Sequence, residues 1–152
     1  MSSSSGWLRN PARALYVDTD MTDLTPLLTQ PGTTLAVIGA TDHPGKYGGI
    51  IYRDLKTKGF PVFAVNPYRE KVDGDPCWKS VRDLPEVPTI AVFVVPARRG
   101  IDVLAECAEV GIENIWVQPG ASSPAFMEAL ESGPFTYLVD ACVMVRARVA
   151  AG

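Results

Sequence analysis

The feature that most constrains the fold is a short apolar run that ends in a glycine and two small residues. The run Leu35–Ile38 is rich in β-branched side chains and leads directly into Gly39-Ala40-Thr41. A run this short, bounded by turn residues, predicts a strand buried on both faces. A helical pattern begins near Lys46, so the turn brings the free N–H groups of a helix start into one loop. Those donors, with the helix dipole, make a ready site for a phosphate.

The rest of the chain repeats this alternation of apolar runs and helical patterns. Five helices are predicted: from a cap at Thr22 or Asp23 through Leu28, from Gly48 to Gly59, over 77–84, from Ile101 to Gly111, and from Ser122 or Ser123 to Gly133. Strands are expected at 35–39, 61–66, 89–95, 114–118 and 136–139. This alternation predicts an α/β protein: a Rossmann-like, doubly wound parallel sheet of about five strands, with helices on both faces.

Residues at the ends of these strands are the candidate site. Ligands of doubly wound sheets bind at the carboxyl ends of the strands, near the point where the strand order reverses. Three of the five predicted strands have a proline within two residues of the end. We expect five strand-end segments to lie along one rim: Gly39-Ala40-Thr41, Asn66-Pro67-Tyr68, Val95-Pro96, Gln118-Pro119-Gly120 and Asp140-Ala141-Cys142.

The first turn departs from the fingerprint of dinucleotide-binding proteins. That fingerprint needs GxGxxG and an acidic residue after the second strand, but here the second glycine is missing and the strand ends in Asn66-Pro67. NAD therefore lacks the carboxylate that usually accepts hydrogen bonds from its ribose. NADP is less excluded, because Arg69 and Lys71 follow directly and could meet a ribose phosphate. The chain also has no Gly-Lys-Ser/Thr sequence of a P-loop.

Short motifs at successive strand ends occur together and in order over about residues 35–145. They are Val37-Ile38-Gly39-Ala40-Thr41, Val65-Asn66-Pro67, Gly74 with Trp78-Lys79-Ser80, Val94-Val95-Pro96, Trp116-Val117-Gln118-Pro119-Gly120, and Cys142. In these motifs the chain resembles the CoA-binding domain proteins, and it is similar to the N-terminal CoA-binding domain of the succinyl-CoA synthetase alpha subunit.

The resemblance implies that CoA lies across the strand ends. The first glycine turn would hold the pyrophosphate, the loop after the second strand would lie beside the adenosine, and Arg69 or Lys71 would meet the 3′-phosphate. Pro96 and Gln118 would flank the pantetheine arm. The implied cofactor-binding residues are Gly39, Ala40, Thr41, Tyr47, Val65, Asn66, Pro67, Tyr68, Arg69, Lys71, Val95, Pro96, Gln118 and Cys142.

Simpler roles stand beside several of these. The first turn could be merely tight, Asn66 could end its strand by bonding to its own backbone, and Arg69 and Lys71 could be solvated loop charges. Tyr47 could contact a phosphate or lie on the helix surface. His43 is more readily a surface or phosphate-adjacent residue than a catalytic base, since the sequence shows it no partner.

Cys142 carries a separate hypothesis. If it is exposed at the rim, its sulfur could form a mixed disulfide with the CoA thiol. The alternative is a buried structural cysteine.

Composition limits the remaining classes of function. A formal charge of −3 over 152 residues argues against a nucleic-acid-binding protein. Three widely spaced cysteines and a single histidine make a zinc site or a disulfide framework improbable. No apolar stretch approaches the roughly 20 residues of a membrane span, and the first residues lack the regions of a signal peptide. We therefore expect a cytoplasmic protein, with an arm over 1–21 and one CoA-binding domain over 22–152.

The expected function is CoA or acyl-CoA binding without catalysis by this chain alone, with no catalytic residue and no metal. The second domain of the synthetase, which carries a phosphorylated histidine, has no counterpart in this sequence. The expected partners are CoA and either a second copy or a partner subunit. Two alternatives stay open: an NADP-dependent oxidoreductase and another nucleotide-binding regulatory module, such as a redox-sensing NAD(H) protein.

Overall fold

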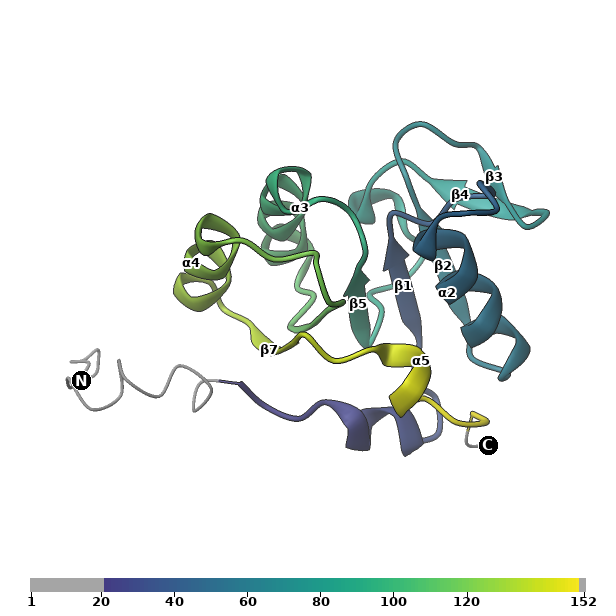
Figure 1. Ribbon diagram of the computed structural model, residues 1–152, viewed down its shortest axis with the longest axis horizontal. Coiled ribbons are helices and arrows are strands. Elements are labelled where there is room, and N and C mark those ends of the chain that lie inside the picture. Colours follow the sequence, from purple (N-terminus) through teal and green to yellow (C-terminus); the bar gives the residue numbers. More distant parts are fainter. Residues whose placement is uncertain (1–20, 151–152) are drawn as a thin grey trace.

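The computed structural model describes residues 21–150 and is built around one seven-stranded sheet (Figure 1). The expected arm over 1–21 lies outside the described residues except for Met21. The strands are β1 (Leu35–Ile38), β2 (Val62–Val65), β3 (Lys71–Val72), β4 (Asp75–Trp78), β5 (Ile90–Phe93), β6 (Asn114–Val117) and β7 (Thr136–Val139). Their order across the sheet is β3-β4-β2-β1-β5-β6-β7. All neighbours are parallel except the antiparallel pair of β3 and β4.

The five predicted strands and the fold class are confirmed. β1 pairs with β2 on one side and with β5 on the other. The chain therefore winds outward in one direction through β2 and in the other through β5, β6 and β7. The strand order reverses between β1 and β5, which is where a doubly wound sheet leaves a crevice.

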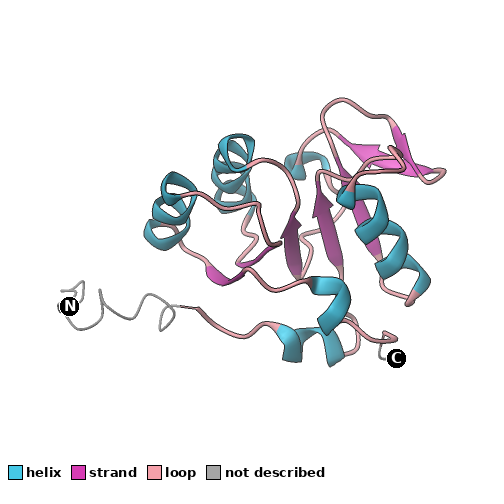
Figure 2. Ribbon diagram, in the orientation of Figure 1, coloured by secondary structure: helices cyan, strands magenta, loops and turns pink. Residues whose placement is uncertain are grey.

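Helices cover both faces of the sheet. They are α2 (Tyr47–Thr57), α3 (Ala97–Val110), α4 (Pro124–Ser132) and the short α5 (Val143–Arg146), with 3₁₀ turns η2 (Thr25–Thr29) and η3 (Val81–Asp83). Figure 2 shows α3 and α4 together on one side of the strands and α2 on the other. Two of the longer helices have the predicted capping residues. Gly111 ends α3 in a left-handed conformation, and the Ser123 hydroxyl caps the start of α4.

The alternation of side chains in β1 divides the core into two layers. Leu35 and Val37 pack toward α2, η2 and α5, whereas Ala36 and Ile38 pack toward α3 and α4. All four side chains are buried. This confirms a strand covered on both faces, and it explains why the run is apolar at every position rather than at every second one.

The prediction of a helix over 77–84 is wrong. Residues 75–78 form β4, which pairs with β2, and only the 3₁₀ turn η3 follows. The cause is the turn Asp73-Gly74, whose residues have φ of 53° and 79° and join β3 to β4 as a hairpin. An Asp-Gly turn between strands is a hairpin signal that favours this pairing over a local helix.

The last described residues close the face that α2 covers. The indole N–H of Trp116 donates to the Ala141 carbonyl at 2.7 Å, and Lys58 Nζ donates to the Met144 carbonyl at 2.8 Å. The Ala150 N–H donates back to the Lys58 carbonyl at 2.8 Å. We call residues 141–150 the closing segment. It lies beside the end of α2 in Figure 1 and takes the place of a longer helix on this face.

Candidate functional site

Gly39 directly follows β1 at the point where the strand order reverses between β1 and β5, and we call this point the crevice. Gly39 has φ of 103°, which side chains rarely allow, and a Cβ there would come within 2.7 Å of Val95 Cγ1. Its N–H donates to the Val65 carbonyl at 2.9 Å. Three strand-end segments predicted to share a rim therefore meet at this one glycine, and only a glycine fits there.

The start of α2 packs tightly against the same turn. A Cβ at Gly48 would lie 2.0 Å from the Gly39 carbonyl oxygen, and one at Gly49 would lie 2.5 Å from the Thr41 carbonyl oxygen. Lys46 precedes the helix without a side-chain cap. The hydrogen bonds of this first turn start with the Gly49 N–H, so the N–H groups of Tyr47 and Gly48 precede them. The close contact of glycines holds these donors beside the crevice.

Asn66 ties the end of β2 to the glycine turn. Its Nδ2 donates to the Ala40 carbonyl at 2.9 Å, and its Oδ1 accepts the Tyr68 N–H at 2.9 Å. The side chain is thus engaged twice, and it fixes the loop of Pro67 and Tyr68 over the rim. Tyr68 and Tyr47 leave 77% and 67% of their surface exposed, so both rings are available to a ligand.

Positive side chains gather beside this loop. The pKa of the Cys77 thiol is raised, because burial outweighs a backbone hydrogen bond with Asn66 and the positive charges of Lys79 and Arg69, which lower it. Arg69 belongs to the loop itself, where its N–H donates to the Asn66 carbonyl at 3.3 Å, and Lys79 Nζ donates to the Pro67 carbonyl at 3.4 Å. Sequence reasoning named Lys79 only within a motif and did not count it as a site residue.

Lys71 lies farther out, on β3. It is exposed and alternates with the buried Val72, so it lies on the face of the hairpin away from α2. The structure thus separates two cations that the sequence treats as equivalent, Arg69 in the loop and Lys71 on the hairpin. Arg98 and Arg99 add positive charge at the first turn of α3, directly after Pro96 at the end of β5.

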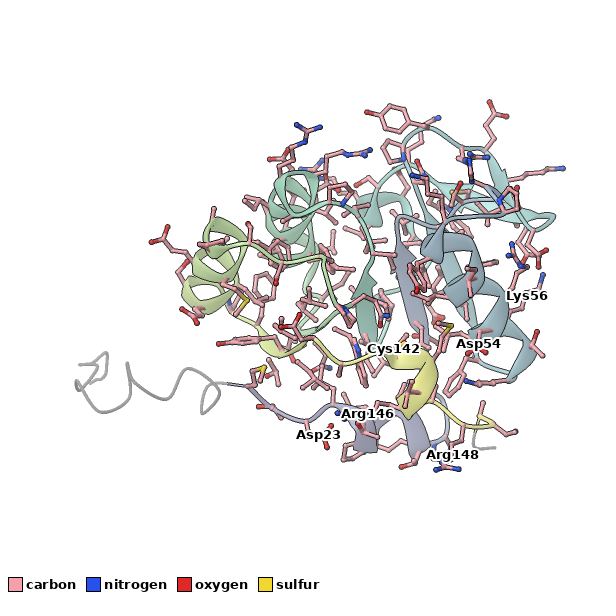
Figure 3. All side chains as sticks on the ribbon, in the orientation of Figure 1. Asp23, Asp54, Lys56, Cys142, Arg146 and Arg148 are labelled. Carbon is pink, nitrogen blue, oxygen red and sulfur yellow. The ribbon has the colours of Figure 1, made fainter. Side chains whose placement is uncertain are left out.

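Gln118 and Cys142 form a second group, at the ends of β6 and β7. Gln118 is buried; its Oε1 accepts the Val143 N–H at 2.7 Å, and its Nε2 lies 3.5 Å from Cys142 Sγ. Both functional groups of this amide are therefore used within the protein. Cys142 is half-buried and lies at the start of the closing segment, where Figure 3 labels it. Sequence reasoning placed Gln118 beside a ligand but missed this structural role.

A hollow of about 320 Å³ lies elsewhere. It is lined by Tyr52, Lys56, Val62, Phe63, Asp75, Pro76 and Trp78. This hollow occurs where β4 stops pairing with β2, because Pro76 has no N–H to continue the ladder. It contains neither a glycine turn nor helix N–H donors, so the crevice at Gly39 remains the better site for an anionic ligand.

Among residues 21–150, no three His, Cys, Asp or Glu side chains gather in a way that could hold a metal ion. His43 is exposed, and its Nδ1 accepts the Gly45 N–H at 3.3 Å. In the same part of the chain, no helix is long and apolar enough to cross a membrane.

A family profile described as a CoA binding domain matches residues 33–148. ADP-forming acetate–CoA ligase II of Archaeoglobus fulgidus is 36% identical over 102 residues, which are 66% of this chain and 15% of the relative. The alpha subunit of ADP-forming acetate–CoA ligase II of Pyrococcus furiosus is 37% identical over 82 residues, 53% of this chain and 18% of the relative. This chain thus spans less than a fifth of the length of either ligase.

A solved structure has nearly the same extent as the matched region. It is a conserved hypothetical protein from Pyrococcus furiosus, 42% identical, with a TM-score of 0.71. The match covers 74% of this chain and 97% of the other.

Proposed function

This chain belongs to the CoA-binding domain family, and on that premise we propose that it binds CoA or acyl-CoA in the crevice between β1 and β5. The observation that carries the proposal is the glycine turn at the point where the strand order reverses. There Gly39 and Gly48 bring the uncapped start of α2 against the end of β1. Helix N–H donors in such a crevice suit a pyrophosphate.

The proposed ligand runs from Asn66 to Cys142. The pyrophosphate would lie at Gly39-Ala40-Thr41 and the first N–H groups of α2, beside Tyr47. The adenosine would lie against the loop that contains Val65, Pro67 and Tyr68, with Arg69 as the main contact of the 3′-phosphate and Lys79 or Lys71 nearby. Charge-assisted hydrogen bonds of this kind contribute roughly 1.5–3 kcal/mol each.

The pantetheine arm would pass Val95 and Pro96 toward Gln118 and Cys142. Because Gln118 is held by Val143 and Cys142, its proposed part is to shape the end of the channel. A CoA thiol that reaches this end would lie close to the Cys142 sulfur.

We propose further that residues 22–152 act as one binding domain and that this chain does not catalyse a reaction by itself. Among residues 21–150, His43 makes no hydrogen bond to a nucleophilic side chain, and its Nδ1 accepts the Gly45 N–H. Because the ligases are much longer and one of them is an alpha subunit, a partner subunit or a second copy is a reasonable companion.

Thermal unfolding with CoA, NADPH and NADH tests the proposed ligand. A ligand that binds only the folded state stabilises it by about 2.7 kcal/mol at a hundredfold excess over Kd. We expect CoA to raise the melting temperature and NADPH and NADH to leave it nearly unchanged. A response to NADPH without one to CoA would instead favour an oxidoreductase, and a response to NADH alone a regulatory module.

Substitution of Arg69 tests the contact with the 3′-phosphate. Arg69→Ala should weaken the binding of CoA by roughly tenfold or more, because one charge-assisted hydrogen bond is lost. It should weaken the binding of dephospho-CoA much less. Arg82→Ala is the control, since Arg82 is an arginine already paired with Glu109 at 2.8 Å. Equal losses for both ligands would remove the role of Arg69 in 3′-phosphate recognition.

The hypothesis for Cys142 is tested with CoA disulfide. The Cys142 thiolate would attack one sulfur of CoA disulfide and break its S–S bond, forming a protein–CoA disulfide and releasing one CoA thiolate, which takes a proton from water. We expect one adduct, removable by reductant and absent in Cys142→Ser. Cys107 should not react, because burial raises the pKa of its thiol to about 12. An unmodified Cys142 would argue for a purely structural cysteine.

A further inference from the structure

The β3–β4 hairpin has little sheet pairing to hold it in place. β3 contains two residues, and β4 pairs with β2 only at Ala64 and Val65. The ladder cannot continue toward Val62, because Pro76 has no N–H to donate. A hairpin with so few sheet bonds needs other contacts to fix its position.

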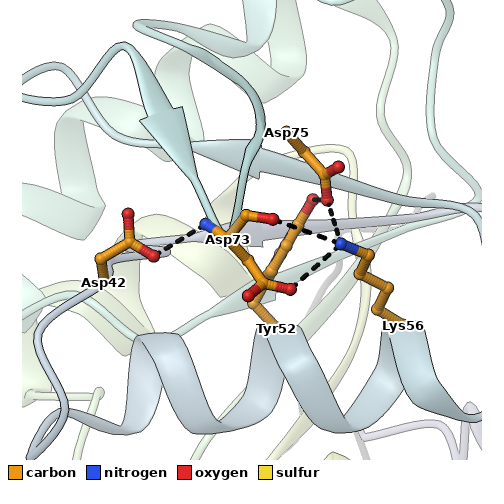
Figure 4. A network of polar contacts seen from close by, with 5 residues as sticks. All are labelled: Asp42, Tyr52, Lys56, Asp73 and Asp75. Carbon is orange, nitrogen blue, oxygen red and sulfur yellow. Dashed lines mark hydrogen bonds and ion pairs between the residues drawn. The ribbon is translucent and has the colours of Figure 1, made fainter.

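Those contacts come from α2 and from the loop after β1 (Figure 4). Lys56 Nζ lies 2.7 Å from Asp75 Oδ2 and 3.0 Å from Asp73 Oδ2. The Tyr52 hydroxyl, one helical turn earlier, donates to Asp75 Oδ2 at 2.8 Å. From the other side, Asp42 Oδ1 accepts the Asp73 N–H at 2.7 Å. We call this group, Asp42, Tyr52, Lys56, Asp73 and Asp75, the hairpin brace.

The pKa shifts agree with a hairpin that is held by ionised Asp75 and Lys56 side chains. Hydrogen bonds from Lys56 and then Tyr52 lower the pKa of Asp75, and bonds to Asp75 and Asp73 raise the pKa of Lys56. Burial, and then the bond to Asp75, raise the pKa of the Tyr52 hydroxyl. Tyr52 is therefore a neutral donor, and Lys56 is the cation that joins the two aspartates.

The brace acts on the same loops as the proposed ligand. Asp42 directly follows Gly39-Ala40-Thr41. Tyr52 and Lys56 lie on α2, which begins at Tyr47, so both supports of the hairpin belong to elements that start at the proposed pyrophosphate site. Arg69 lies between Asn66, which is bonded to Ala40, and Glu70, whose carbonyl accepts the Cys77 N–H at 2.9 Å. A shift of the hairpin would therefore carry the Arg69 end of the loop with it.

We propose that the hairpin brace positions Arg69 for the 3′-phosphate, and that Asp42 and Lys56 thereby set the preference for CoA over dephospho-CoA. This inference rests on the proposed function. Neither Asp42 nor Lys56 needs to touch the ligand. Each is a positioning residue that holds the hairpin relative to the glycine turn.

Calorimetric titration with CoA and with dephospho-CoA tests the brace through the ratio of the two dissociation constants. Lys56→Met and Asp42→Ala should each reduce that ratio by roughly five- to tenfold, a size typical of indirect coupling. Asp42→Asn should retain it, because the amide oxygen still accepts the Asp73 N–H. Lys58→Met is the control: Lys58 also lies 2.7 Å from an aspartate, Asp54, near the end of the same helix, and its other bond is to the Met144 carbonyl of the closing segment, not to the hairpin. Because the closing segment lies at the other end of the proposed ligand, loosening it should not change the ratio of the two dissociation constants.

The outcomes separate the two proposals. A wild-type chain that prefers CoA, with Lys56→Met and Asp42→Ala variants that keep the full preference, overturns the brace alone. A wild-type chain that binds neither ligand overturns the proposed function and the brace with it. A general loss of stability would weaken the binding of both ligands equally and leave the ratio of the two dissociation constants unchanged. That result also counts against the brace.

Discussion

At the scale of single residues, glycines decide how closely the first strand, its turn and the helix after it approach one another. The turn lacks the second glycine of the dinucleotide fingerprint, yet Gly48 and Gly49 supply the close helix contact that the last glycine of that fingerprint provides. Sequence reasoning found Gly39 because a strand ended there. It could not assign the other two, since a glycine inside a helical pattern gives no sign of what packs against it.

Gly48→Ala tests this packing. In an open helix, alanine in place of glycine stabilises by up to about 1 kcal/mol, but here the new Cβ would lie 2.0 Å from the Gly39 carbonyl oxygen. We expect a net loss of roughly 1–3 kcal/mol in the free energy of unfolding, typical of an overpacked site. Urea unfolding measures it.

Gly45→Ala is the control for that experiment. Its nearest neighbour would be the His43 ring at 3.8 Å, an ordinary contact, so its stability should change by less than about 0.5 kcal/mol. A stabilised Gly48→Ala variant would show that the helix and the turn are not in close contact.

At the scale of elements, sequence reasoning predicted the regular strand–turn–helix units and missed the hairpin, although its Asp73-Gly74 turn is a local hairpin signal. Apolar runs bounded by proline and glycine locate β1, β2, β5, β6 and β7, and the capping residues Gly111 and Ser123 locate helix ends. β4 escaped because its residues include Asp75 and Pro76, which disfavour a strand. Its pairing depends on tertiary contacts to β2 and α2, and no local pattern encodes these. For the same reason the site could be predicted as strand-end segments, but not which cations lie close together.

The hairpin should become less firmly held in acid. The pKa of Asp75 is below its ordinary value of 3.8 in the folded protein, so its contribution to stability is complete above about pH 4 and is lost as the pH falls through the lower, folded pKa. Asp75→Asn should be less stable than wild type at pH 6, and the difference should shrink toward pH 3. Urea unfolding at several pH values measures the difference, and a constant gap would contradict the ionised contact.

At the scale of the whole molecule, two apolar layers share one sheet but are closed by different means. Helices α3 and α4 cover one face along their length, whereas the other depends on α2, η2 and the closing segment. Trp116 joins these parts, because its ring is buried in the sheet and its indole N–H bonds to Ala141. Sequence reasoning missed the closing segment, since the four residues of α5 give too short a pattern.

Trp116→Phe should loosen this closure. The substitution leaves the Ala141 carbonyl without its donor, and an unsatisfied buried group costs roughly 1–3 kcal/mol, with a further loss from the smaller ring. Trp78→Phe is the control, because Trp78 is only half-buried and packs edge-on against Phe63 at 5.5 Å. Denaturant unfolding of the two variants compares them, and equal losses would contradict the role of the Trp116 hydrogen bond.

The central place of β1 in the sheet also determines when a growing chain can complete the crevice between β1 and β5. β1 is the earliest strand of the described chain, but its partner β5 begins only at Ile90. At the base of the pair, the Thr89 N–H donates to the carbonyl of Thr34, 55 residues earlier in the chain. A nascent polypeptide stopped before Ile90 would contain the complete glycine turn and α2, yet only one wall of the crevice. If the crevice binds the proposed ligand, capture on the ribosome must therefore wait until β5 has emerged.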